Sequence, residues 1–96
     1  MAAAGAGATY HFVANAVPGT DLYGNAEEAC RLWHVLAAHL RGAVAVYVMG
    51  THLHAQHELD VGTALGRALW TYARWRNVRR GERGRVFAPR PPGHPR

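Results

Sequence analysis

The chain has 96 residues, 49% of them hydrophobic, and a formal net charge of +5 at pH 7. This length corresponds to one small domain or to part of one, with enough apolar residues for a modest core. Cys30 is the only cysteine, which excludes an intrachain disulfide and fits a reducing compartment. No apolar run is long enough to span a bilayer, so we expect a cytoplasmic protein with no membrane partner.

The basic residues gather in the C-terminal third of the chain. Residues 1–66 carry two arginines against five acidic residues, whereas residues 67–96 carry nine arginines against one glutamate. Such a distribution is typical of a segment that binds a polyanion. A GC-rich coding sequence would also explain why every basic side chain is arginine, but arginine binds phosphate in a bidentate manner whatever the origin of this bias.

The first predicted elements are a strand and a helix. Residues 1–8 are rich in alanine and glycine and lack the basic residues of a signal peptide, so we expect a disordered lead-in. Alternating side chains predict a strand over residues 9–17, which a Pro-Gly turn ends. Asn25 with Glu28 three residues later is a helix-capping pattern, and apolar residues at helical spacing follow as far as Gly42.

Two further strands and a second helix follow in the sequence. Residues 43–49 are almost entirely apolar, as in a central strand that is covered on at least one side. Residues 52–59 are predicted as the hairpin partner of this strand, across a Gly-Thr turn. The second helix covers about residues 61–79, with Asp60 as its predicted N-cap.

The order strand, helix, strand, strand, helix predicts an α+β fold in which helices pack on an antiparallel sheet. We divide the chain into the lead-in of residues 1–8, a domain of residues 9–87 and a tail of residues 88–96. The tail is too rich in proline and arginine to fold by itself.

Two histidines on the third predicted strand form the clearest chemical motif. At the strand period of two, His52 and His54 point to one face, about 7 Å apart at the backbone. Their ring nitrogens can therefore reach one divalent cation, while Leu53 between them anchors the strand in the core. Gln56 and Glu58 share this face, either as polar sheet residues or as further ligands.

Four segments of the chain form a co-linear set of motifs. They are Tyr10-His11-Phe12, then Leu22-Tyr23 with Glu27-Glu28, then Tyr47-Val48-Met49-Gly50-Thr51-His52-Leu53-His54, and finally Tyr72-Ala73-Arg74-Trp75-Arg76-Asn77 with Arg79-Arg80-Gly81-Glu82-Arg83-Gly84. In order and spacing they resemble the single-tyrosine HUH transposases of the REP-associated, insertion-sequence type, over about residues 9–87. The resemblance implies a ferredoxin-like HUH-nuclease architecture with the order β-α-β-β-α.

The resemblance also implies a DNA transposase that cleaves and rejoins single-stranded or hairpin DNA. Tyr72 would be the nucleophile that forms a 5′-phosphotyrosine linkage. His52 and His54 would hold Mg²⁺ or Mn²⁺, with Asn77 as the third ligand. The family further implies a homodimer, in which the tyrosine of one protomer faces the histidines of the other. The DNA backbone would be neutralised by a set of arginines, namely Arg74, Arg76, Arg79, Arg80, Arg83 and Arg85.

The sequence departs from the family pattern at several places, among them His57, where the family has an apolar residue, and Trp75, in the place of an aromatic pair. Gly50-Thr51 replaces the usual Pro-Asn of the turn, and Arg76 lies four residues after Tyr72, where a cation would not help to bind a metal. After Phe87 the sequence leaves the pattern altogether. These departures favour an alternative function, that of a truncated and catalytically inactive transposase relic that acts only as a nucleic-acid-binding module.

Two structural interpretations also stay open beside catalysis. Tyr72 shares the apolar stripe of Leu65 and Leu69, and without the resemblance this pattern predicts a core tyrosine. The histidine pair together with His57 offers the residue types of a structural zinc site, although His57 points to the opposite face of a regular strand.

Overall fold

The computed structural model describes residues 9–89. The predicted lead-in and residues 90–96 of the predicted tail lie outside the described residues. The predicted order of five elements is confirmed, with ends that differ by a few residues. These elements are β1 (Tyr10–Asn15), α1 (Ala26–His39), β2 (Ala45–Val48), β3 (His52–His57) and α2 (Gly62–Arg80).

The three strands form one antiparallel sheet in the order β1-β3-β2, so β3 is the central strand. The hairpin of β2 and β3 is confirmed. The prediction that the apolar residues 43–49 form a central strand is wrong, because β2 lies at the edge of the sheet. Its valines are only partly buried, and Tyr47 faces solvent. The apolar run of residues 43–49 is therefore explained by an edge strand whose one face is covered by the helices and whose other face carries exposed apolar side chains.

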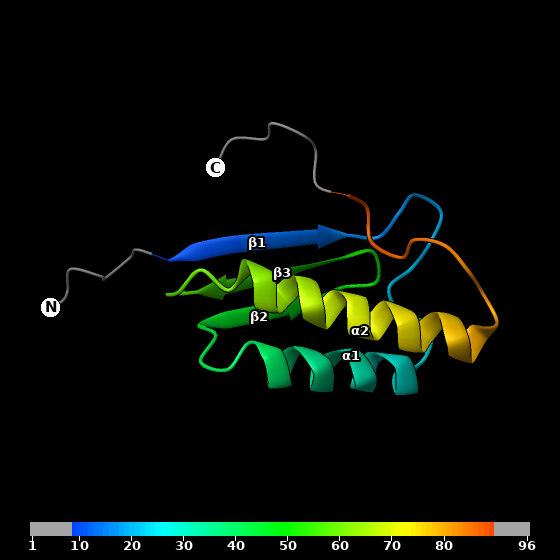
Figure 1. The fold of residues 1–96 in the computed structure, drawn as a ribbon, viewed down its shortest axis with the longest axis horizontal. Coiled ribbons are helices and arrows are strands. Elements are labelled where there is room, and N and C mark those ends of the chain that lie inside the picture. Colours follow the sequence, from blue (N-terminus) through cyan, green and yellow to red (C-terminus); the bar gives the residue numbers. More distant parts are fainter. Residues whose placement is uncertain (1–8, 90–96) are drawn as a thin grey trace, which may run out of the picture.

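Both helices cover the same face of the sheet, and no other element of residues 9–89 covers the opposite face, which we call the open face (Figure 1). Alternate residues of the strands, such as Phe12 of β1 and Leu53 of β3, point to the helices and are buried. The helices pack against each other as well as on the sheet. The helical part of the core consists of Leu32, Val35, Leu36 and Leu40 of α1 and Leu65, Ala68 and Tyr72 of α2.

The ends of the helices follow the capping rules in part. Asn25 caps α1, because its side-chain oxygen accepts a hydrogen bond from the Glu28 amide at 2.9 Å. The N-cap of α2 is Val61 and not the predicted Asp60, which instead accepts a hydrogen bond from the Gly62 amide at 3.1 Å. Neither helix of the described part combines the length and the hydropathy that a membrane span requires.

The residues after α2 return to the sheet beside β1. Phe87 forms an antiparallel bridge with Ala16. The Val17 amide donates to the Val86 carbonyl at 2.9 Å, and Val86 is buried. This short pairing fastens the end of the domain to the outer edge of β1.

Candidate functional site

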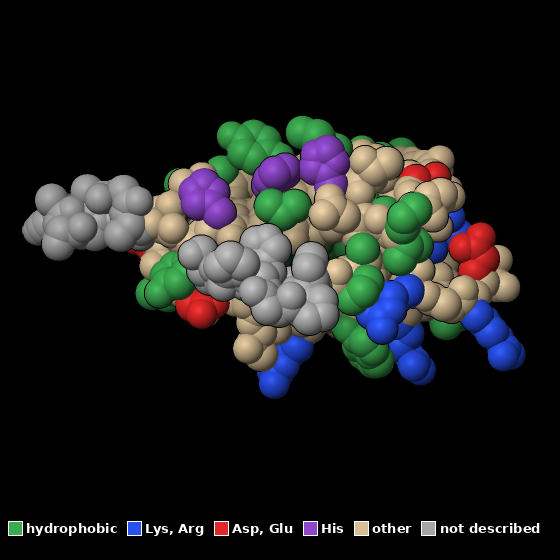
Figure 2. Space-filling model, turned by 90° about the horizontal axis from the view of Figure 1, so that it is seen from above, with side chains coloured by type: hydrophobic (Ala, Val, Ile, Leu, Met, Phe, Trp, Pro, Cys, Tyr) green, Lys and Arg blue, Asp and Glu red, His purple; other side chains and the backbone are tan. Residues whose placement is uncertain are grey.

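The open face of the sheet carries three rows of side chains, each with one residue from β1, one from β3 and one from β2 or from the position directly after it. The register places these rows side by side as His11–Gln56–Ala45, Val13–His54–Tyr47 and Asn15–His52–Met49. Four of these side chains are rings, and none is acidic or an arginine. In Figure 2 the visible histidines gather along one side of the molecule, and most of the visible arginines lie on the opposite side.

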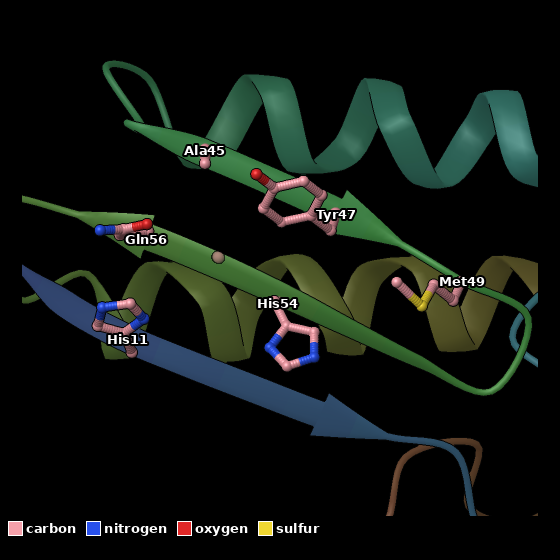
Figure 3. A pocket seen from close by; sticks show the side chains of 7 residues that line it. His11, Ala45, Tyr47, Met49, His54 and Gln56 are labelled. Atoms are coloured by element: carbon pink, nitrogen blue, oxygen red, sulfur yellow. The ribbon is translucent and has the colours of Figure 1, made fainter.

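An open hollow of about 400 Å³ lies on this face (Figure 3). Its residues come from all three strands, and they are His11, Ala45, Tyr47, Met49, His54, Ala55 and Gln56. Tyr47 is 59% exposed. The side-chain amide of Gln56 donates to Thr9 Oγ1 at 3.0 Å, which leaves its carbonyl oxygen free to accept from a ligand. The hollow therefore combines flat apolar surface with polar groups at one end.

His52 and His54 share the open face, as the sequence predicts. Their ring centroids are 5.2 Å apart, and the ring planes stand at 79° to each other. His54 is exposed, while His52 is partly buried and has its Nδ1 3.3 Å from the Thr51 hydroxyl. Apart from this contact, no hydrogen bond with residues 9–89 engages a ring nitrogen of either histidine, so each ring keeps a nitrogen that is available to a ligand.

The described residues offer an incomplete metal site around these two rings. In the range 9–89 no group of three His, Cys, Asp or Glu side chains converges, whereas a divalent cation takes four or more ligands. The amide of Asn77 donates to the Gly84 carbonyl at 2.8 Å and accepts from Arg76 Nη1 at 3.0 Å. These contacts hold Asn77 at the C-terminal end of α2, so the remaining ligands of an ion would be water or phosphate oxygens.

Tyr72 lies in the core between α2 and the rest of the domain. Its side chain is 0% exposed, and its hydroxyl donates to the Leu22 carbonyl at 2.5 Å. Burial, followed by the negative charge of Glu28, raises the pKa of Tyr72 to about 12. Because α2 covers the face opposite to the histidine pair, the structure does not bring Tyr72 together with His52 and His54 within one chain.

Arg76 belongs to the core and not to an exposed basic surface. Only 3% of the residue is exposed, and its Nη2 donates to the Asp21 carbonyl at 3.1 Å. Nη1 lies 3.5 Å from the Glu82 carboxylate. The prediction that Arg76 contacts DNA therefore conflicts with its place in this structure, because its guanidinium is buried and cannot reach a phosphate.

Two further predicted DNA-binding arginines pair with the first turn of α1. Arg80 donates to both carboxylate oxygens of Glu28, at 2.8 and 2.5 Å, and Arg79 forms an ion pair with Glu27. The hydrogen bond from Arg80, helped by one from the Gly24 amide, lowers the pKa of Glu28 to about 2. These pairs join the C-terminal end of α2 to the N-terminal end of α1 and neutralise the positive charge there.

The remaining predicted DNA-binding arginines are exposed. Arg74, Arg83 and Arg85 form no ion pair with the described residues. The guanidinium of Arg74 lies over the ring of Trp70, 5.6 Å from its centroid. Of the six predicted arginines, these three thus keep an uncompensated charge at the surface.

His57 is separate from the histidine pair. It is buried on the helix-facing side of β3, where its Nε2 donates to the Arg41 carbonyl at 2.8 Å. Its Nδ1 accepts from the Leu59 amide at 2.9 Å. Since both ring nitrogens are engaged, the structure does not support the three-histidine zinc site.

Sequence reasoning missed the contribution of the two outer strands to the open face. Tyr47 and Met49 line the hollow, and His11 closes it at the side of β1 (Figure 3). Alternation along residues 43–49 already places Tyr47 and Met49 on one face, but only the strand register shows that this is the face of His54.

Comparison of the chain with known protein families, with curated proteins and with solved structures found no match.

Proposed function

We propose that this domain binds single-stranded nucleic acid on the open face of its sheet. The observation that carries the proposal is the set of rings that the three strands place on this face, namely His11, Tyr47, His52 and His54, of which all but His52 line the hollow. Unpaired bases stack on such rings without strong preference for sequence, and acidic side chains that would repel phosphate are missing from these rows.

The topology supports the HUH-type architecture to which the sequence points. A ferredoxin-like fold follows the order β-α-β-β-α-β, and the described elements supply its first five members. In this proposal the bridge between Phe87 and Ala16 takes the place of the last strand, beside β1. The domain then has an HUH-type fold in which the histidine pair lies on the central strand.

Binding fits the geometry better than cleavage does. A nucleic acid can reach the open face without any change in the fold. Cleavage would need the phenol of Tyr72 to leave a fully buried position and break its hydrogen bond with Leu22. Its raised pKa also disfavours the phenolate that would attack phosphorus.

Titration of labelled single-stranded oligonucleotides against the purified protein tests the proposal. We expect wild-type protein to bind, and Tyr47→Ala or His54→Ala to weaken binding by about fivefold to tenfold each, because each substitution removes a stacking surface. Trp33→Ala on α1 is the matched control and should bind as wild type does. Absence of binding by the wild-type protein, or equal binding by all variants, would contradict the proposal.

A second candidate function is the strand cleavage and joining of an HUH transposase. The close approach of His52 and His54 on one face favours it, because two imidazoles could hold Mg²⁺ or Mn²⁺ beside a scissile phosphate. The nucleophile would have to come from a released Tyr72, or from the Tyr72 of a second copy in a homodimer.

Incubation of the protein with labelled single-stranded or hairpin DNA and Mn²⁺ tests this second candidate. A covalent protein–DNA adduct that is lost in both Tyr72→Phe and His52→Ala would establish cleavage. The melting temperature of each variant serves as the control for folding, because Tyr72→Phe leaves the Leu22 carbonyl without its donor. Binding without an adduct would rule out the enzyme and leave the binding module.

A further inference from the structure

The outer face of α2 carries a row of side chains that no other part of the described domain covers. Arg67, Trp70 and Arg74 recur at positions i, i+3 and i+7, which places them on one side of the helix. All three are exposed. They point away from the buried side of the same helix, which is formed by Leu65, Ala68, Tyr72 and Arg76. We call this row, Arg67, Trp70 and Arg74, the α2 ridge.

The α2 ridge is positively charged without local compensation. α2 contains five arginines and no acidic residue. Arg76, Arg79 and Arg80 pair with carboxylates of neighbouring segments, whereas Arg67 and Arg74 form no ion pair with any residue in the range 9–89. Two free guanidinium groups on one helix face attract anions.

Trp70 lies between these two arginines and is 65% exposed. The guanidinium of Arg74 stands 5.6 Å from the centre of its ring, a cation–π contact that restrains the ring. Tryptophan and arginine are enriched among the residues that contribute most of the binding free energy at interaction surfaces. The ridge therefore combines a flat aromatic surface with a cation on either side.

We propose that the α2 ridge is a second contact surface for single-stranded nucleic acid, with a base stacked on Trp70 and phosphates bound by Arg67 and Arg74. The two arginines are seven residues apart, which is roughly 10 Å along the helix and close to the length of three stacked nucleotides at about 3.4 Å each. This inference takes its ligand from the proposed function but places the contact on the opposite layer of the domain.

The ridge suits a nucleic acid better than an anionic membrane surface. A helix that lies in a membrane inserts a continuous apolar face, and the apolar face of α2 is already buried in the core. The ridge offers only one large apolar ring between two charges. A stacking base and its flanking phosphates match this pattern of one ring and two cations.

Salt-dependent titration with single-stranded oligonucleotides tests the ridge. For the double variant Arg67→Gln/Arg74→Gln we expect the slope of log K against log salt to decrease by about 1.4, since each phosphate contact contributes about 0.7. Trp70→Ala should weaken binding about tenfold. Arg41→Gln and Trp33→Ala remove an exposed arginine and an exposed tryptophan elsewhere, and both should retain the wild-type affinity to within about twofold.

The outcomes separate this inference from the proposed function. If the ridge variants bind with the wild-type affinity and salt dependence while Tyr47→Ala loses affinity, the proposed contact at the α2 ridge is overturned and the proposed function is not. A wild-type protein that binds no oligonucleotide would overturn both proposals. Vesicles that contain phosphatidylserine should not bind the protein. Vesicle binding that the ridge variants abolish, with oligonucleotide binding unchanged, would assign the ridge to a membrane and overturn the inference.

Discussion

At the scale of single residues, two polar side chains of α2 satisfy backbone groups in the core. Tyr72 donates to the Leu22 carbonyl, and Arg76 donates to the neighbouring Asp21 carbonyl. These two carbonyls precede α1 and lie outside any strand or helix, so they need partners from elsewhere in the fold. Tyr72 and Arg76 therefore have a structural task here, which fixes α2 to the segment before α1.

Arg76 illustrates what the sequence could and could not reveal at this scale. It follows Tyr72 by four residues, so helical geometry places both side chains on the same side of α2. That spacing predicts that Arg76 is buried if Tyr72 is buried. Its positive charge, together with the cluster of arginines around it, favoured an exposed position, because an arginine is seldom fully buried unless it is paired. The Asp21 carbonyl that accepts from it lies 55 residues away in the sequence, and the Glu82 carboxylate lies beyond the end of α2, so neither partner follows from the spacing along the helix.

Glu28 provides a prediction for acid stability. The pKa of this buried carboxylate is lowered from 4.5 to about 2, first by its hydrogen bond from Arg80 and then by that from the Gly24 amide. Since the pKa in the folded state lies below that in the unfolded state, the stabilisation is complete above about pH 5. It is lost as the pH falls towards 2.

We therefore expect Glu28→Gln to decrease the free energy of unfolding at pH 7 by about 2 to 3 kcal/mol and to flatten the loss of stability below pH 5. Urea unfolding at a series of pH values measures both effects. Glu27→Gln is the matched control, because its carboxylate is exposed and its ion pair with Arg79 should contribute about 0.5 kcal/mol or less. An acid profile of Glu28→Gln that equals that of wild type would contradict this account.

At the scale of the elements, local sequence patterns predict the helices, the strands and the faces of their side chains, but they do not predict the order of the strands in the sheet. The alternation of β3 correctly places His52 and His54 on one face and His57 on the other. The spacing of apolar residues likewise predicts both helices. The position of β2 at the edge and the return of Phe87 to β1 were missed, because strand order depends on contacts between segments far apart in sequence.

The arginines of α2 also show that contacts between distant segments cannot be predicted from local sequence, here for the candidate nucleic-acid surface. Nine arginines in the last thirty residues predicted a single basic surface. The structure divides this charge into arginines that hold α1 and α2 together and arginines that face solvent, such as Arg67 and Arg74. Only the contacts with the acidic first turn of α1 distinguish the two groups, and these contacts span about fifty residues of sequence.

At the scale of the whole molecule, the domain presents two different surfaces on its two layers. The sheet layer presents rings and a hollow that no arginine lines, and the layer of the two helices, on the other side of the sheet (Figure 1), carries the charged α2 ridge. A single strand bound by both surfaces has to pass around an edge of the domain. If the open face stacks bases and the ridge binds phosphates, as we propose, affinity should depend on both the rings and the salt concentration.

The most direct measurement of the central claim is an NMR titration of the ¹⁵N-labelled protein with a single-stranded oligonucleotide. The amide signals of His11, Tyr47, His54 and Gln56 should shift on binding, because these residues surround the hollow on the open face. The amides of Leu32 and Leu36 on α1 lie in the core and serve as internal controls. If no amide signal of the three strands shifts at saturating oligonucleotide, nucleic-acid binding on the sheet would be contradicted.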